Sequence, residues 1–358
     1  MNMERKEYIL TPLTCIHIGT GEEITSLEYK IEKTKYKKPL YCKFSDDNLL
    51  QRILDDKQDL DDFNQACKNR DKKYFHDTFT KDDLDYFCDV TEDFIDYTED
   101  RDPHNNAMSV FQMYRTRGLP VIPGSSLKGS IRTALLNKHL NDLNDKDIFM
   151  DEGLARRALL DYNDPLRTVC ITDSSFGNPM EIQLVGRLKQ VSLDKKTERL
   201  RSKNFLIAAE MIKGTLLGGN VASKLHISIN NNLSNVKHLQ KITFDDIRES
   251  CNSFYWQEFE NEYDTFYQEV NDDFKLINRL GNLLRKVKDS KRQFMVRVGR
   301  WSQFEFVTLD KLRRLEMDGK KNSTTRTLFY NEEKDVDGKH SNRYYLPMGW
   351  CVLSAKEE

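Results

Sequence analysis

The chain has 358 residues, of which 38% are hydrophobic and 32% charged, and its formal net charge is -2. This length has room for about two domains, and the composition is typical of a soluble protein with a modest core. No apolar run reaches the ~20 residues needed to span a bilayer, so we expect no membrane partner. Because the chain is not basic overall, any nucleic acid must bind to a local cationic face.

Seven cysteines are scattered along the chain, and no two of them form a CxxC pair. This pattern is typical of reduced thiols and predicts neither a disulfide framework nor a zinc site. The first residues, MNMERKEYILTP, contain no apolar export signal. We therefore expect a cytoplasmic protein without a metal or another cofactor.

The first part of the chain predicts strands followed by helices. Residues 7–18, EYILTPLTCIHI, predict a strand that stops at Gly19-Thr20-Gly21, and residues 27–44 predict a hairpin. Helices are expected from Ser45 onward, and residues 76–102 carry eleven acidic and two basic side chains. We interpret the segment of about 45–117 as a helical insert with an acidic face that repels RNA phosphates. Two roles stay open for this face, solubility and the docking of a basic partner.

The rest of the chain mixes both kinds of element. Helices are predicted around 154–162 and over most of 244–289, with strands over 168–176, 224–230 and 343–355. Two stretches are basic: residues 186–203 have seven basic and two acidic side chains, and residues 279–300 have eight and one. Strands and helices alternate with hairpins rather than in regular βαβ units. This favours an α+β fold with ferredoxin-like sheets.

Residues 118–139, GLPVIPGSSLKGSIRTALLNKH, predict an extended segment that turns at Pro123-Gly124 into a helix. Ser125, Lys128, Gly129 and Arg132 fall on one side of that helix. A serine at the start can cap it, but cations are disfavoured there by the helix dipole, and glycine weakens the helix relative to alanine. A bound phosphate accounts for the cations and the glycine together. An ordinary capped amphipathic helix is the alternative.

Three motifs follow one another along the chain. They are PLTCIHIGTG, then VIPGSSLKGSIRTAL, and finally RVGRWSQ followed by YLPMGW. This set resembles the RAMP superfamily of CRISPR effector proteins and, more narrowly, the type III-A Csm-complex subunit that caps the 3′ end of the guide RNA. The resemblance spans most of the chain. One departure is the C-terminal glycine-rich loop, usually of the GxG type, which here keeps one glycine in Val298-Gly299-Arg300-Trp301.

The resemblance implies RRM-like (ferredoxin-like) folds, with an N-terminal domain over 1–225 that contains the insert and a second, degenerate domain over 226–358. It implies a non-catalytic subunit that binds guide RNA (crRNA) and supports crRNA maturation and antiviral defence. The implied partners are the crRNA, the neighbouring RAMP backbone subunit, the small helical subunit of the complex and a nearby target RNA, with host processing nucleases as a further partner of the insert. The expected RNA-binding residues are His17, Gly19, Gly21, Ser125, Ser126, Lys128, Gly129, Arg132, Arg297, Arg300 and Trp301.

His17 has a second interpretation, because related CRISPR repeat-processing endonucleases use a histidine as general base. The alternative function is therefore a metal-independent endoribonuclease that processes CRISPR repeat RNA. A histidine at a strand end is more often a hydrogen-bonded structural residue or a phosphate donor. No second acid–base partner can be placed beside His17, so we expect RNA binding and no catalytic residue. Asp173, in ITDSS, is expected to cap a turn.

Overall fold

The structure is a computed structural model of the chain. The residues that it describes are 3–34, 37–55, 57–78, 80–99, 108–142, 165–178, 183–193, 200–230, 241–268, 274–310, 323, 325–334 and 341–356. The helix expected around 154–162 lies outside these ranges. Within them, none of the helices combines the length and the apolar character needed to cross a membrane.

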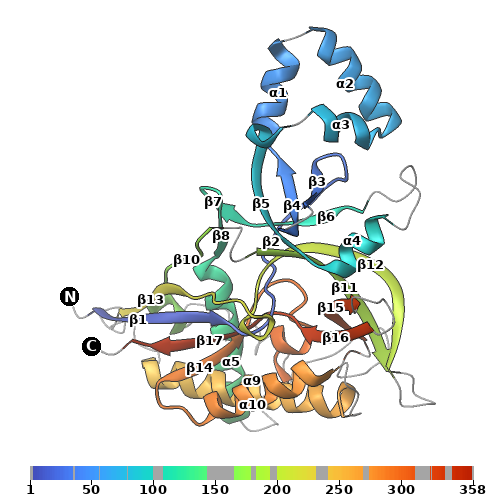
Figure 1. Cartoon of the computed structure of the whole chain (residues 1–358). Helices are drawn as coiled ribbons and strands as arrows, with labels where there is room; N and C mark the ends of the chain where they lie inside the picture. Colours follow the sequence, from blue (N-terminus) through green and yellow to red (C-terminus); the bar gives the residue numbers. More distant parts are fainter. Residues whose placement is uncertain are drawn as a thin grey trace, which may run out of the picture.

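One antiparallel sheet of five strands takes strands from both ends of the chain (Figure 1). Its order is β14 (Gln293–Arg297), β17 (Trp350–Ala355), β1 (Met3–Pro12), β13 (Ser223–Asn230) and β9 (Val169–Ile171). In β1, alternate side chains from Tyr8 to Pro12 are buried, as a strand with one face on the core requires. Pro12, which has no N–H for the ladder, ends the strand.

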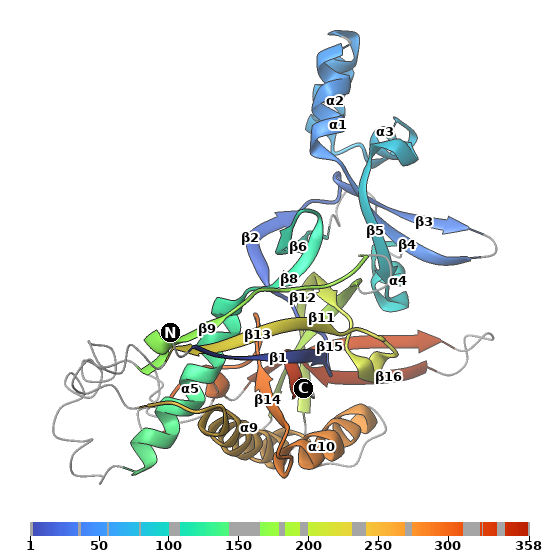
Figure 2. The same ribbon diagram turned by 90° about the vertical axis from the view of Figure 1, so that its left-hand side faces the viewer.

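Three helices cover one face of this sheet: α5 (Gly124–Asp142), α9 (Phe244–Phe266) and α10 (Lys275–Lys288) (Figure 2). At the start of α9, Thr243 Oγ1 accepts from the Asp246 N–H at 3.1 Å, and the Asp246 carboxylate accepts from the Thr243 N–H at 2.9 Å. This capping box satisfies two groups that a helix start leaves unpaired. The three helices and the sheet enclose one apolar cluster that includes Leu127 and Trp350.

The second sheet has nine strands in the order β2–β6–β12–β11–β5–β4–β3, with β15 added to β11 and β16 added to β15. Their bounds are β2 Gly19–Ile24, β3 Tyr29–Thr34, β4 Lys37–Phe44, β5 Leu84–Val90, β6 Val110–Met113, β11 Gln183–Leu193, β12 Leu200–Ile212, β15 Thr325–Lys334 and β16 Ser341–Pro347. Helix α4 (Glu92–Glu99) packs on β11 and β15. A small third sheet joins β10 (Ser174–Ser175), β8 (Leu119–Ile122) and β7 (Arg115–Thr116). The predicted α+β class and the hairpin over 27–44 are confirmed.

Helices α1 (Asp46–Asp55), α2 (Lys57–Asn69) and α3 (Lys72–Thr78) form a lobe beyond the ends of β4 and β5 (Figures 1 and 2). The lobe has a small apolar core that includes Phe44, Ala66 and Phe75. The helical insertion is thus confirmed, but its expected span of 45–117 is too long. Strand β5 lies inside that span because its alternating buried residues, Tyr86 and Cys88, give it the period of a strand.

The expected domain boundary between residues 225 and 226 falls inside β13. All eight residues of that strand pair with β1, from Met3 opposite Asn230 to Leu10 opposite Ser223. The other side of β1 pairs with β17, from the C-terminal part of the chain. The two halves of the chain therefore share one sheet, and they are not two consecutive domains.

Two glycines let the motif segments cross one another in close contact. Gly349 separates β16 from β17, where the sequence predicts a single strand over 343–355. Its φ is +91°, and a Cβ at this position would lie 2.3 Å from the Val298 carbonyl oxygen. Gly299 has a φ of +89°, and its Cβ would lie 2.5 Å from the His17 carbonyl oxygen. Only glycine accommodates both this backbone and these distances. The N- and C-terminal motifs therefore meet through their main chains.

We expect Gly349→Ala to destabilise the fold by about 2–5 kcal/mol, because it adds both backbone strain and a clash. Gly177→Ala is the matched control, since a Cβ at Gly177 meets no atom within 4 Å, and it should change the free energy of unfolding by less than about 0.5 kcal/mol. Urea unfolding of the two variants measures the difference. Equal stability of Gly349→Ala and wild type would contradict this packing.

Candidate nucleic-acid interface

His17 lies inside the crossing, and its side chain is fully buried. Its Nδ1 donates to the Glu210 carbonyl oxygen at 2.7 Å, and its Nε2 has no hydrogen-bond partner in the described part of the chain. Burial lowers the pKa of His17 to about 4, so the ring is neutral at pH 7. A neutral, enclosed ring reaches neither a 2′-hydroxyl as general base nor a phosphate as donor. The expected RNA contact of His17 is therefore wrong, and its role is structural.

A buried carboxylate joins the strands beneath His17. The carboxylate of Glu210, in β12, accepts from the Met113 N–H at 2.8 Å, from Arg115 at 2.9 Å and from the Tyr86 hydroxyl. Burial, together with the charge on Glu210, raises the pKa of Tyr86 well above its usual value, so this hydroxyl remains a donor. The hydrogen bonds compensate the desolvation of the charge. Four strands, β5, β6, β7 and β12, are thereby fixed under the site.

Above this layer, a guanidinium and two aromatic rings meet at the surface. The exposed Arg300 places its guanidinium 4.0 Å from the ring centroid of Phe111 and 5.1 Å from that of Trp301. The Trp301 ring lies 4.9 Å from the His17 ring, and the Arg300 N–H donates to the His17 carbonyl at 2.9 Å. Such a combination of charge and aromatic faces suits single-stranded RNA. The exposed Gly19 lies alongside, paired with β6 in the same sheet.

The start of α5 is capped from outside the helix. The Gly124 N–H donates to Asp173 Oδ1 at 2.8 Å. The helix begins at Gly124, so Ser125 lies within its first turn. Contrary to the expectation from the sequence, Ser125 is therefore not the capping residue. Asp173 was expected to cap a turn, and its carboxylate instead caps the start of this distant helix. A carboxylate next to the helix start also offsets the positive end of the helix dipole.

The cations of α5 are only partly available to a ligand. Lys128 is half-buried, and its Nζ donates to the Val169 carbonyl at 2.8 Å, which leaves two of its three N–H groups for another contact. Arg132 is also half-buried, whereas Ser125 and Gly129 are exposed. A Cβ at Gly129 would meet no atom within 4 Å, so this glycine leaves open space on the helix surface.

Arg297 does not belong to this surface. Its side chain is 0% exposed, its Nη1 lies 2.8 Å from Glu262 Oε2, and its Nε donates to the Met348 carbonyl at 2.8 Å. The prediction that Arg297 binds RNA is wrong, because the ion pair with a buried carboxylate holds it in the core. Its main chain does connect the two motifs, since Ser130 of α5 donates to the Arg297 carbonyl at 3.0 Å.

The predicted residues thus fall into three groups. Gly19, Gly21, Ser125, Gly129 and Arg300 are exposed, Ser126, Lys128, Arg132 and Trp301 are half-buried, and His17 and Arg297 are enclosed. Phe111 was missed, because VFQM is a short strand without a motif and only the pairing of β6 with β2 brings it to Arg300. In the described residues, no cluster of three or more His, Cys, Asp or Glu side chains could hold a metal ion.

Comparison with known proteins agrees with this architecture. The family model of the RAMP superfamily matches residues 9–333. The chain belongs to the RAMP superfamily. This RAMP protein is 31% identical over 134 residues to the Csm5 protein of a CRISPR system from Streptococcus thermophilus. That alignment covers 36% of this chain and 37% of the relative, so it spans well under half the length of the curated protein.

Two solved structures share the fold of this RAMP protein. One is a chain in the cryo-EM structure of a Csm–crRNA–target RNA ternary complex of a type III-A system, with a TM-score of 0.63, 18% identity and coverage of 98% of this chain and 100% of that chain. The other is the crystal structure of T. onnurineus Csm5, with a TM-score of 0.63, 18% identity and coverage of 96% and 100%. The resemblance to the RAMP superfamily that the motifs indicated is confirmed.

The buried His17 predicts a pH dependence of stability. Its folded pKa of about 4 lies below the usual histidine pKa of 6.5. The unfolded chain therefore takes up the proton first, and stability falls as the pH falls from 6.5 toward 4. Between pH 6 and 5, His17 should contribute up to about 1.4 kcal/mol per pH unit. Urea unfolding at several pH values should show a shallower fall for His17→Asn than for wild type. Identical slopes would mean that the ring is not enclosed.

Proposed function

We propose that this RAMP protein is a non-catalytic crRNA-binding subunit of a type III-A CRISPR effector complex, and that it caps the 3′ end of the guide. The observation that carries the proposal is the exposed Arg300 guanidinium, stacked on Phe111 and fixed by its main chain to His17. Membership of the RAMP superfamily and the likeness to a chain of a Csm–crRNA–target RNA complex support it. The enclosed position of His17 removes the base that the endoribonuclease alternative needs.

In this proposal, guide phosphates contact Arg300 and the start of α5, and at least one base stacks on the aromatic rings. Phosphate contacts position an RNA without reading its sequence, which suits a subunit that must accept any guide. Gly19 and Gly21 are exposed at the start of β2 and let an RNA backbone come close. Gly129 leaves room above α5, with Lys128 and Arg132 as flanking charges.

The proposed partners are the crRNA, the neighbouring RAMP backbone subunit, the small helical subunit and a nearby target RNA. The lobe of α1–α3 extends away from the sheet covered by α5, α9 and α10 (Figure 2). It is a suitable place for processing nucleases to dock without blocking the Arg300 surface. The strands below it already pair, with Phe44 opposite Leu84. A short turn can therefore replace residues 45–83.

Arg300→Gln should weaken the binding of a 30-nucleotide oligouridylate and reduce the salt slope of log affinity by about 0.7, the value for one lost phosphate contact. Phe111→Leu should cost about 1–3 kcal/mol of binding free energy, because a base loses its stacking partner, without a change of slope. Lys68→Gln, on the lobe, is the matched control and should bind as wild type. Fluorescence anisotropy at several salt concentrations measures all three. A wild-type slope for Arg300→Gln would contradict the proposed contact.

Replacing residues 45–83 by an Asn-Gly turn should separate RNA binding from guide processing. The shortened protein should bind the oligouridylate as wild type, because the Arg300 surface is intact. Guides in cells that carry it should keep unprocessed 3′ ends, whereas guides in cells that lack the whole chain should also lose their defined length. Sequencing of guide ends reports both effects. Normal ends with the shortened protein would leave the lobe without a role in processing, and normal ends without the chain would refute the capping position.

A further inference from the structure

Helix α10 carries a row of exposed cations that the proposed guide contact does not use. Arginines and lysines are exposed along its whole length and in the turn after it, whereas Asp289 is the one exposed carboxylate of this stretch. Among the described residues, none forms an ion pair or a hydrogen bond with the side chains of six of these cations. The row, here named the α10 ridge, consists of Lys275, Arg279, Arg285, Lys286, Lys288 and Lys291.

The helix dipole explains only part of the ridge. Arg285, Lys286 and Lys288 lie in the last turn of α10, where cations interact favourably with the negative end of the dipole. Lys275 is the first residue of the helix and Arg279 follows one turn later, where the dipole disfavours them. The start of α10 has neither an acidic residue in its first turn nor a side-chain cap. By contrast, α9 begins with Asp245, Asp246 and a capping box.

Neighbouring cations on the ridge also repel one another. Lys275 and Arg279 stand at i and i+4, and Arg285 and Lys288 at i and i+3, spacings that place side chains next to each other on a helix. Water and salt screen such pairs, but an external anion compensates them better. The ridge from Lys275 to Lys288 is about 20 Å long, at 1.5 Å per residue. An extended polyanion matches this shape better than a single small anion does.

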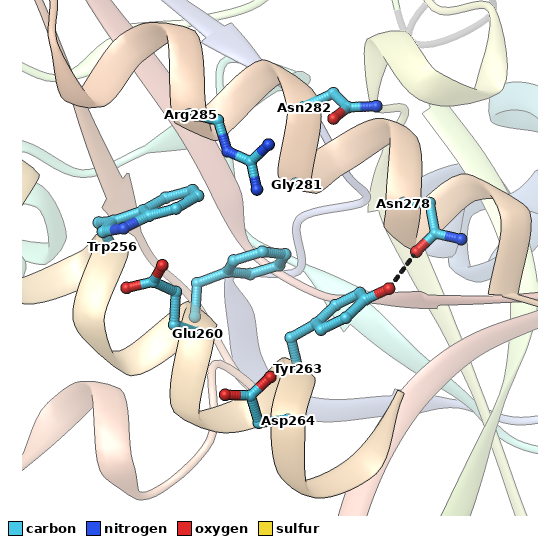
Figure 3. Close-up of a pocket in the computed structure, with 9 residues that line it drawn as sticks. Trp256, Glu260, Tyr263, Asp264, Asn278, Gly281, Asn282 and Arg285 are labelled. Atoms are coloured by element: carbon cyan, nitrogen blue, oxygen red, sulfur yellow. Dashed lines mark hydrogen bonds between the residues drawn. The ribbon is translucent and has the colours of Figure 1, made fainter. Parts of the chain in front are cut away.

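The groove between α9 and α10 shows on which side such a polyanion would lie (Figure 3). The groove encloses about 410 Å³, and Glu260 and Asp264 of α9 line one wall while Asn278, Asn282 and Arg285 of α10 line the other. The carboxylates repel phosphates from the α9 side. The aromatic rings at its base are enclosed, with Trp256 at 5% and Phe259 at 3% exposure, so they offer no face for a base. Arg285 and Lys288 also face the groove side, 5.8 and 5.1 Å from the Trp256 ring centroid. A polyanion is therefore directed to the outer side of α10, along Lys275, Arg279 and Lys286.

We infer that the α10 ridge is a second RNA-binding surface, which holds a single strand by its phosphates and without base stacking. It is separate from the Arg300 surface, because α10 packs on α9 and β14 at the bottom of both views, whereas β2 and β6, the strands beside Arg300, lie in the upper half (Figures 1 and 2). An acidic protein surface is the competing partner. RNA is favoured because the cations continue over the whole helix without the apolar contact area that a protein interface centres on.

The test neutralises three ridge cations that stand clear of the groove, in the variant Lys275→Gln, Arg279→Gln, Lys286→Gln. Glutamine keeps a comparable helix propensity, and circular dichroism with thermal unfolding verifies the fold. Binding of the 30-nucleotide oligouridylate should lose up to about 2 units of salt slope, at ~0.7 per contact. The matched control removes the same charge from exposed residues of the lobe, as Lys68→Gln, Arg70→Gln, Lys73→Gln, and should keep the wild-type slope. Arg300→Gln is measured alongside.

Each outcome decides the inference. A reduced salt slope for the ridge variant, with a wild-type slope for the lobe control, supports the inference. If Arg300→Gln also binds as wild type, the inference about the ridge still holds, whereas the proposed guide contact of Arg300 is wrong. A wild-type slope for the ridge variant overturns the inference, whatever Arg300→Gln does. If the ridge variant keeps the wild-type slope but fails to enter the reconstituted complex, α10 contacts an acidic protein surface instead. An equal loss in the lobe control would reduce the effect to net charge and would also overturn the inference.

Discussion

The close approach of main chains around residues 13–18 is the constraint on which the rest of the structure depends. The Leu13 N–H donates to the Trp350 carbonyl at 2.8 Å, and Ile16 pairs with Ile212, so the segment after β1 is fixed to both β17 and β12. A Cβ at Gly214 would lie 2.5 Å from the Leu13 carbonyl oxygen. Main chains at such distances leave no room for side chains, which is also why the C-terminal motifs have glycine at positions 299 and 349. Some of the motif residues that mark the family therefore serve the packing of the main chain, and not contact with a ligand.

Buried charges fix this crossing to its surroundings. Glu262 interacts with Arg297 at 2.8 Å and with Arg326 at 2.9 Å, and all three side chains are at most 3% exposed. Desolvating such groups is costly, and the attraction between them offsets that cost only while the partners are held in place. Arg297 belongs to β14 and Glu262 to α9, so the helical layer cannot shift against the sheet without separating the charges. The loop with Arg300 starts from the end of β14, and its position is therefore set by this network.

Local patterns in the sequence predicted most elements, since a hairpin such as 27–44 and a helix such as 244–266 depend on nearby residues. The outcome differed for side chains whose roles depend on distant segments. His17 and Arg297 have the chemistry of RNA contacts, but Glu210 and Glu262, far away in the sequence, draw them into the core. Phe111 carries no motif and reaches the surface site only through the pairing of β6 with β2. The strand β15 went unrecognised because TRTLFYNEEK has few apolar residues, and its neighbour β11 supplies the pairing.

The distribution of charge shows why a net charge of -2 says little about what this chain can bind. The basic stretch 279–300 is divided by the fold: Arg297 is enclosed, Arg300 is exposed beside Phe111, and the remaining cations follow α10. Glu260 and Asp264 lie on a different helix and meet α10 only across a groove. Charges of opposite sign pair only where their side chains meet, either at i, i+3 or i, i+4 on one helix or across a contact between two helices. Cations and carboxylates can thus be almost equal in number while each surface keeps its own sign, and it is this local sign that attracts a charged partner.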